Sequence, residues 1–326
     1  MVAVQTQYAA SLTTAIAART RKLPKDWESK ALAPGGSIVK SWSVRHTLHA
    51  HTKEDHDLLV GCVGPRHVER YRTWFDEIVE GGFDSLMEQI YTALQDGPLT
   101  REELHAAVPA LRSIPHAGWG RDTAGLAFQR KLCIVGRGSE QKFAALLPVG
   151  AGHRLGALLR RYLQAFAPAT KKDFYYWAGL GMVHVKAAFE ELASELESCE
   201  IDGKAGQHFI LKTQPVPEPR PLGLKLLAKF DALLLAHHDK SLFLPPEDRS
   251  RVFRIAGQVE ATVLSEGRVI GTWRLRRLGS RAMIAVEPFR EFKAREKARL
   301  DKEAARMAKL LGFQSVQVEL VSPAAL

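Results

Sequence analysis

Apolar residues recur every three or four positions through residues 155–166, which is the period of a helix with one buried face. Pro168 ends this helix because proline has no amide hydrogen for the hydrogen-bond ladder. Thr170 takes the N-cap position of the next helix, with Asp173 in its first turn. Residues 183–196 then predict a third helix.

Two short strand patterns follow, at residues 198–201 and 208–211, joined by the turn dipeptide Asp202-Gly203. Three helices followed by a hairpin is the order of a winged helix, which is a helix-turn-helix variant.

The same order is predicted upstream. Residues 82–97 form an amphipathic helix, and Thr100 with Glu103 forms the capping box of the next. A third helix is predicted over residues 118–131 and a hairpin over residues 132–147. The two stretches do not resemble each other in sequence, so the repeat is one of architecture.

The N-terminal part predicts a third such unit. Two helices over residues 7–31 precede two strands within residues 37–52, which kink near Arg45. Further helices are expected at residues 54–63 and 66–75. The leading helix of this unit is expected to be missing.

A proline-rich stretch, residues 214–221, is the clearest predicted domain boundary. Beyond it a charged helix is expected over residues 289–311. Strand patterns between these two segments predict a small β-barrel or a strongly bent sheet. These strands are expected at residues 225–227, 232–235, 252–255, 258–264, 268–275 and 282–287.

The predicted fold class is therefore α+β, with three tandem winged-helix units followed by a C-terminal β-barrel and a terminal helix. The predicted domains are residues 1–75, 76–150, 151–213 and 222–326.

The charge of the chain indicates an anionic partner. The 326 residues carry a net charge of +10, and nucleic acid is favoured over membrane because no basic amphipathic anchor is present. There is no signal-peptide pattern and no apolar run of the ~20 residues that span a bilayer. Cys62, Cys133 and Cys199 are widely spaced without a CxxC pair, which favours a reducing, cytoplasmic location.

The sequence lacks the motifs that are typical of nucleotide-cofactor, calcium and other metal sites. No Walker loop, GxGxxG, HExxH or DxDxDG pattern occurs, so no nucleotide cofactor or calcium is expected. Histidines cluster around Arg45, and His49 and His51 share one face of a strand, but no clear third metal ligand accompanies them. No metal site is therefore expected. The cluster consists of His46, His49, His51 and His56.

An aspartate and histidine cluster in the C-terminal part suggests a catalytic dyad. Asp231 and Asp239 flank His237 and His238, but no GxSxG motif supplies a nucleophile. A structural or phosphate-facing role is therefore favoured.

A family pattern is carried by the stretches VQTQYAASLTTAIAART, WSVRHTLHAHTKED, RRYLQAFAPATKKDFYYWAGL, and KLLAKFDALLLAHHDKSLFL with EGRVIGTWRLRR. In these stretches the chain resembles the AlkZ/YcaQ-like family of bacterial winged-helix DNA glycosylases. The resemblance implies three tandem winged helices and a C-terminal β-barrel.

The same resemblance implies that a Gln-x-Gln pair carries catalysis, and by position this pair is Gln5 and Gln7. Thr6 stands where the family usually has an apolar residue, and a segment that precedes the motif in the family is absent. The resemblance also implies active-site support from Arg45, Thr47 and His49. Arg45 could contact a phosphate and His49 could orient water; alternatively, both satisfy buried polar groups in the first hairpin.

Basic residues outside this motif are candidates for contacts with the DNA backbone, which give affinity and salt dependence but no sequence reading. They are Arg137, Lys171, Lys172, Lys186, Arg274, Arg276, Arg277 and Arg281.

The expected function is that of a monofunctional DNA glycosylase, without cofactors, that removes alkylated or crosslinked purines by water attack. A cytoplasmic monomer acting on damaged double-stranded DNA is expected. The alternative is a non-catalytic winged-helix DNA-binding protein, either a regulator or a self-resistance factor. A third reading is an inactive relative.

Overall fold

The computed structural model describes residues 2–115, 120–147, 154–204, 206–215, 218 and 221–322. They form two compact units. The first unit comprises Met1–Gln7 and Glu28–Gln214, and the second comprises Tyr8–Trp27 and Pro215–Leu326. The segment Tyr8–Trp27 thus groups with the C-terminal part, although the sequence pattern assigns it to the N-terminal domain. The finer division into four domains stays a prediction.

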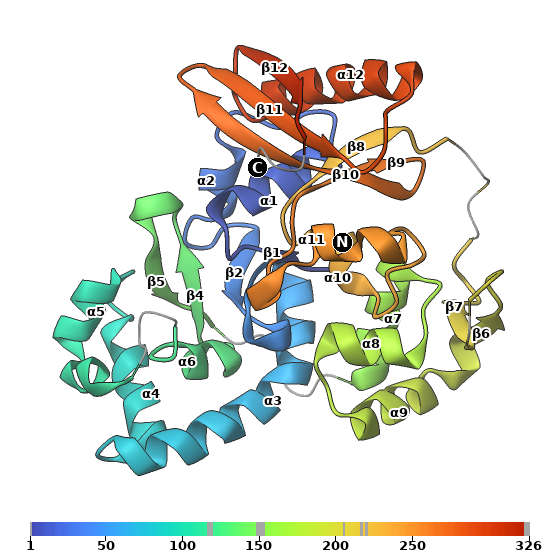
Figure 1. The fold of residues 1–326 in the computed structure, drawn as a ribbon. Coiled ribbons are helices and arrows are strands. Elements are labelled where there is room, and N and C mark those ends of the chain that lie inside the picture. The colour runs from blue at the N-terminus through green and yellow to red at the C-terminus, as the bar shows by residue number, and fades with distance from the viewer. Residues whose placement is uncertain are drawn as a thin grey trace. The chain divides into compact units, whose positions relative to one another are not determined.

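The first unit contains a five-stranded sheet in the order β1-β3-β2-β4-β5 (Figure 1). Antiparallel pairing of Lys40 in β2 with Ile134 in β4 joins the two hairpins that the sequence predicts in separate domains. The strands are β1 (Val4–Gln5), β2 (Ile38–Trp42), β3 (Leu48–Thr52), β4 (Leu132–Val135) and β5 (Lys142–Ala145).

One long helix, α3 (Lys53–Ile78), occupies the region where the sequence predicts two helices. Pro65 lies inside it without ending it. Gly64 lies where α3 meets α6 (Ala124–Phe128), and a Cβ atom at Gly64 would come within 2.4 Å of the Phe128 carbonyl oxygen. The expected break was wrong because tertiary packing outweighs the local cost of the proline.

The capping box predicted at Thr100 and the N-cap predicted at Thr170 are confirmed, and the N-cap at Thr170 is also a capping box. The Thr100 amide donates to the Glu103 carboxylate at 2.7 Å, and the Thr170 amide donates to Asp173 at 2.8 Å. The predicted helix over residues 118–131 is confirmed only as the short α6; residues 116–119 lie outside the described part. The other helices of this unit are α2 (Trp27–Ala31), α4 (Gly82–Ala93), α5 (Arg101–Ala107), α7 (Leu155–Phe166), α8 (Lys171–Ala178) and α9 (Met182–Glu191).

After α9, the strands β6 (Leu196–Cys199) and β7 (His208–Leu211) pair as a separate hairpin. The order α7, α8, α9, β6, β7 is the predicted one. A large apolar core holds the helices of this unit together, and its fully buried rings include Phe75, Phe83 and Tyr162. Burying each such side chain contributes about 1.5–3 kcal/mol.

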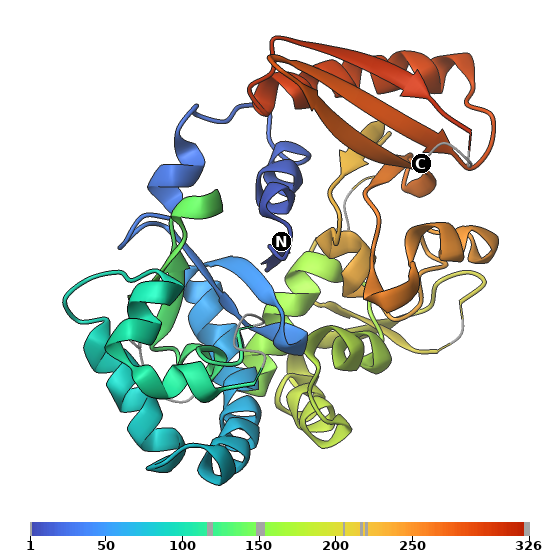
Figure 2. The same ribbon diagram turned by 60° about the vertical axis from the view of Figure 1, so that its left-hand side comes forward.

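The second unit contains a five-stranded sheet in the order β12-β11-β10-β9-β8. Figure 2 shows the orange and red strands of this sheet with the red helix α12 beside them. Helix α12 (Ala294–Leu310) connects β11 to its parallel neighbour β12, and Leu300 and Met307 pack in the apolar cluster of this sheet. The strands are β8 (Leu224–Leu227), β9 (Thr262–Ser265), β10 (Arg268–Leu278), β11 (Arg281–Pro288) and β12 (Ser315–Leu320).

In the described residues β8 and β12 are the two ends of this strand order and do not pair, so the sheet is open and the expected closed barrel is not formed. The predicted strand at residues 232–235 is instead the helix α10 (Ala232–Ala236), and that at residues 252–255 gives way to α11 (Arg249–Val252). A short apolar run does not distinguish a strand from a buried helix. Helix α1 (Ala9–Ala17) also belongs to this unit.

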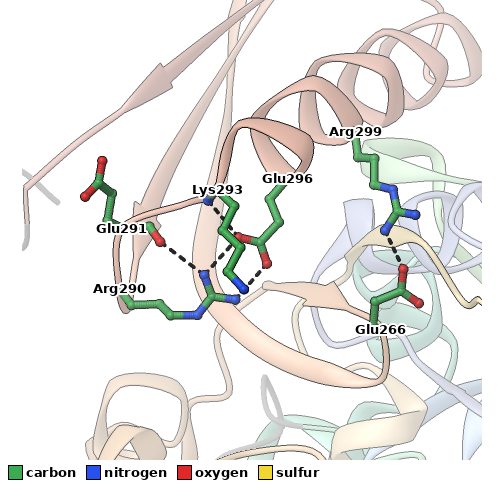
Figure 3. Close-up of polar contacts among 6 residues, drawn as sticks. All are labelled: Glu266, Arg290, Glu291, Lys293, Glu296 and Arg299. Atoms are coloured by element: carbon green, nitrogen blue, oxygen red, sulfur yellow. Dashed lines mark hydrogen bonds and ion pairs between the residues drawn. The ribbon is translucent and has the colours of Figure 1, made fainter.

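The start of α12 is fixed by charged groups (Figure 3). The Arg290 guanidinium donates to both Glu296 oxygens, at 2.8 and 2.7 Å, and the Lys293 amide donates to the same carboxylate at 2.9 Å. The hydrogen bonds from Arg290 are the largest reason why the pKa of Glu296 falls to about 2. A carboxylate in the first turn also suits the helix dipole.

Across the described chain, no helix combines the length and the apolar character needed to cross a bilayer.

Candidate active site

A cleft of about 760 Å³ opens on the first unit. Its lining residues come from the chain just after β1, the turn between β2 and β3, helix α3, and the chain just before α6. The lining residues are Gln7, His46, Thr47, Arg70, Tyr71, Trp74 and Arg121.

The two predicted catalytic glutamines occupy different environments. Gln5 lies on β1, pairs with His49 of β3, and is only 7% exposed. The Thr6 amide donates to the Leu48 carbonyl at 2.8 Å and continues this pairing for one residue. Gln7 is exposed and lines the cleft. Of the predicted pair, Gln7 therefore reaches the cleft and Gln5 lies behind it.

The turn between β2 and β3 has an unusual backbone. Arg45 and His46 have φ angles of 55° and 59°, a left-handed conformation that costs non-glycine residues about 1–3 kcal/mol each. The turn is held from two sides. The Arg45 guanidinium donates to the carbonyl of Trp177 at 2.9 Å, and His46 Nε2 forms a hydrogen bond with the Tyr71 hydroxyl.

The three predicted support residues are divided between the cleft and the interior. Thr47 lines the cleft. Arg45 is half-buried and its guanidinium contacts the Trp177 carbonyl, which fits the alternative of satisfying a buried polar group. His49 is 2% exposed, and its Nδ1 lies 3.0 Å from both the Ser43 hydroxyl and the Thr47 carbonyl. Burial lowers the pKa of His49 to about 3, so this imidazole is neutral.

His49 belongs to a row of buried histidines. The rings of His49 and His51, and those of His51 and His56, have centroids 5.8 Å apart. His51 Nε2 lies 3.1 Å from the Ser43 hydroxyl. Within the described residues, no group of three or more histidine, cysteine or acidic side chains is arranged to hold a metal ion.

Four cleft residues escaped the sequence interpretation: Arg70, Tyr71, Trp74 and Arg121. The first three lie on α3, where Arg70 and Trp74 are one helical turn apart. Their types are common on helix surfaces, so only the fold reveals them as a group. In the sequence, the one indication was that Arg70 and Trp74 are four residues apart, which places them on the same face of a helix.

Tyr71 and His46 form a neutral pair. Burial raises the pKa of Tyr71 to about 12. Burial also lowers the pKa of His46, and the charges of Arg70 and Arg121 lower it further. The Tyr71 hydroxyl and His46 Nε2 thus form a hydrogen bond between two neutral groups, and their rings stack with centroids 5.6 Å apart.

The predicted DNA-backbone contacts lie outside the described lining of the cleft. Those in the first unit are exposed, and Arg137 lies 3.6 Å from the Glu28 carboxylate. Those in the second unit are exposed on β10 and β11. Their binding to DNA stays a prediction. The residues are Arg137, Lys171, Lys172 and Lys186 in the first unit, and Arg274, Arg276, Arg277 and Arg281 in the second.

The aspartate and histidine cluster of the second unit makes structural contacts. Asp231 accepts two hydrogen bonds from Arg19, at 2.8 and 2.6 Å, and caps α10 through the Leu233 amide at 3.0 Å. Asp239 accepts from the Ser241 amide at 2.9 Å. These contacts agree with the structural role favoured above.

An exposed amide beside arginines and aromatic rings, on a basic protein, is the composition expected of a nucleic-acid site. The sequence profile described as "DNA glycosylase AlkZ-like" matches residues 1–310. The chain therefore belongs to the AlkZ-like DNA glycosylase family, and it is an enzyme of the class that hydrolyses N-glycosidic bonds of DNA.

Two similarities to individual proteins agree with this assignment. The interstrand DNA cross-link repair glycosylase of Streptomyces sahachiroi is 26% identical over 309 residues, which cover 87% of this chain and 82% of that protein. The solved structure of the Streptomyces sahachiroi DNA glycosylase AlkZ matches with a TM-score of 0.79 at 23% identity, covering 98% of this chain and 91% of that one. The second similarity supports the α+β fold.

Proposed function

We propose that this protein is a monofunctional DNA glycosylase that releases alkylated purines, carrying N7 or N3 adducts or crosslinks, by attack of water. The observation that carries the proposal is the position of Gln7, which lines the basic, aromatic cleft next to Thr47 and His46. The relative named for interstrand cross-link repair supports a bulky substrate. An open cleft suits an adduct too large for a tight pocket.

The proposed chemistry needs little acid or base strength. An alkylated N7 purine already carries positive charge, so its glycosidic bond is weakened before the enzyme acts. The amide oxygen of Gln7 would orient the attacking water and stabilise the oxocarbenium-like sugar. Gln5 is buried behind it on β1 and would hold the strand and the local polar network in place.

We also propose that the predicted winged helices underlie the DNA contacts. The orders α7, α8, α9, β6, β7 and α4, α5, α6, β4, β5 each give three helices followed by a hairpin, which supports this interpretation. The exposed lysines Lys171 and Lys186 would then contact DNA phosphates.

The decisive experiment measures base release from duplex DNA that carries N7-methylguanine or a nitrogen-mustard crosslink. Wild type is compared with Gln7→Ala, Gln5→Ala and the double variant. Gln89→Ala serves as a control because Gln89 is exposed on α4 and is not among the described lining residues of the cleft. Duplex binding is measured for every variant.

We expect wild type and Gln89→Ala to release the base and the double variant to lose release while it keeps its affinity for DNA. Release that survives in the double variant would refute the assignment of the glutamines. Tight, salt-sensitive binding without release from either lesion would favour a non-catalytic DNA-binding protein.

A further inference from the structure

Arginines of the first unit are commonly neutralised by carboxylates. Arg70 and Arg121 are exposed and have no ion pair among the residues that the structure describes. Arg45, Arg66 and Arg112 also lack one there, but only Arg70 and Arg121 line the cleft. The paired arginines are Arg72, Arg101, Arg130, Arg137, Arg154, Arg160 and Arg161.

These two cations meet at one cleft. The Arg121 guanidinium lies over the Trp74 ring, 5.4 Å from its centroid, and Arg70 precedes Trp74 by one turn of α3. Both arginines line the same cleft as Gln7, so their positive potential acts within it. Their charges also lower the pKa of His46 and partly oppose the burial that raises the pKa of Tyr71.

The contact with Trp74 positions the Arg121 guanidinium beside the cleft. A guanidinium has five N–H donors and can form two parallel hydrogen bonds with one ligand. An oxyanion with two oxygens is the partner that this geometry fits best.

The positive charge of the cleft indicates which part of the substrate lies beside Arg70 and Arg121. An alkylated purine is itself cationic, so two unneutralised arginines would repel it. The DNA backbone carries the matching negative charge, and arginine is a common donor to phosphate oxygens. The damaged base would instead lie nearer to the neutral amide of Gln7 and the neutral His46–Tyr71 pair.

We propose, on the basis of the function proposed above, that Arg70 and Arg121 bind backbone phosphates next to the damaged nucleotide and thereby hold its sugar beside Gln7. The two arginines form a phosphate-binding edge of the cleft, with Trp74 as the support of Arg121.

The test uses the full chain with Arg70→Gln, Arg121→Gln, the double variant, and the charge-preserving Arg70→Lys and Arg121→Lys. Arg112→Gln is the matched control, because Arg112 is also exposed in the first unit but lies outside the described lining of the cleft. Affinity for an undamaged duplex is measured across a range of salt concentrations. Single-turnover base release is measured as a function of enzyme concentration.

We expect each glutamine variant to bind DNA several-fold more weakly and to reduce the slope of log affinity against log salt by about 0.9, the value for one lost phosphate contact. The lysine variants should recover most of the slope, and Arg112→Gln should keep it. The enzyme concentration for half-maximal release should rise, while the maximal rate constant changes little.

An unchanged salt slope in the double variant would overturn the proposal. So would a lower maximal rate constant with unchanged affinity, which would mean that the arginines act through His46. The salt slope is measured without base release, so it reports on the arginines even if the glutamine variants refute the proposed chemistry.

Discussion

Single side chains around the cleft are held in place by groups that take no part in the proposed chemistry. The pair of His46 and Tyr71 is the clearest case, because His46 has a left-handed backbone conformation and its imidazole is tied to α3 by one hydrogen bond. Thr47 follows His46 directly and lines the cleft. The geometry of the cleft wall thus depends on a hydroxyl that is buried.

We predict that Tyr71→Phe lowers both stability and the rate of base release. The variant removes one buried hydrogen bond, which is worth about 0.5–1.5 kcal/mol of the free energy of unfolding. It also frees the strained turn, so the maximal single-turnover rate should fall more than DNA affinity does. Urea unfolding and base release measure the two effects.

Tyr91→Phe is the control for this variant, because Tyr91 lies on α4 outside the described cleft lining. A Tyr71→Phe protein with wild-type release and wild-type stability would show that the hydroxyl does not hold the turn.

Buried histidines predict a stability that depends on pH. Burial lowers the pKa of His49 to about 3 and that of His56 to about 4, from an ordinary value of 6.5. Between pH 6.5 and these lowered pKa values, the unfolded chain binds more protons than the folded chain. The contribution of the two histidines to the free energy of unfolding is therefore complete above about pH 6.5 and is lost as the pH falls. The slope is at most about 1.4 kcal/mol per pH unit for each histidine.

Urea unfolding at pH 7.5 and pH 5 tests this expectation. The His56→Gln variant should lose less stability between the two pH values than wild type, whereas replacement of the exposed His184 by Gln should not change the difference. Equal pH dependence in wild type and His56→Gln would contradict the expectation.

Among the secondary-structure elements, α3 connects packing to the cleft. Its residue Gly64 allows close approach to the end of α6, and seven to ten residues later the helix presents Tyr71 and Trp74 to the cleft. The position of both rings therefore depends on how closely α3 approaches α6.

We predict that Gly64→Ala destabilises the protein by about 1–3 kcal/mol, because its Cβ would lie 2.4 Å from the Phe128 carbonyl and the two helices must separate. Gly181→Ala is the control, since the nearest atom to a Cβ there is 3.4 Å away, and a change below about 1 kcal/mol is expected. Thermal unfolding measures both. An unaffected Gly64→Ala protein would mean that the contact relaxes without cost.

Structural features that depend on residues close together in the sequence could be predicted from it. The capping box at Thr100 and the N-cap at Thr170 depend on residues within one helical turn, and both predictions are confirmed. The pairing of Lys40 with Ile134 joins segments far apart in the chain, so no local pattern could indicate it. The continuation of α3 through Pro65 could not be predicted for the same reason, because α3 contacts α6, which is distant in the sequence.

The residues of the candidate site likewise divide into those that the sequence could indicate and those that only the fold brings together. Gln7 and Thr47 were predicted from a family resemblance, and both line the cleft. Arg70, Trp74 and Arg121 were not predicted, because an arginine or a tryptophan on a helix or in a turn is ordinary until the fold brings it to a shared cleft. His49 was expected near the cleft and is instead buried, since its strand position places it behind the turn.

At the scale of the whole molecule, each compact unit is built from two separate pieces of chain. In the second unit Arg306 of α12 binds the segment Tyr8–Trp27, since it donates to the carbonyls of Ala17 and Thr20, both at 2.7 Å. The N-terminal segment is thus an integral part of that unit.

We predict that Arg306→Met loosens the second unit selectively. Amide hydrogen exchange should become faster in α1, α12 and β10, because the hydrogen bonds that join α1 to α12 are lost, and should stay unchanged in β2 and β3 of the first unit. Lys302→Met, an exposed change on the same helix, is the control. Equal acceleration in both units would contradict the division into two units.

The chain leaves the first unit between Gln7 and Tyr8, directly after the proposed catalytic amide, and returns at Glu28. Neither unit corresponds to one uninterrupted stretch of the gene. A single recombination crossover cannot exchange either unit whole between two relatives, because it would separate an N-terminal piece from its partner. Exchange of either unit whole requires crossovers at all three boundaries, after residues 7, 27 and 214. We therefore expect the specificity of this enzyme to diversify by point substitution rather than by exchange of domains.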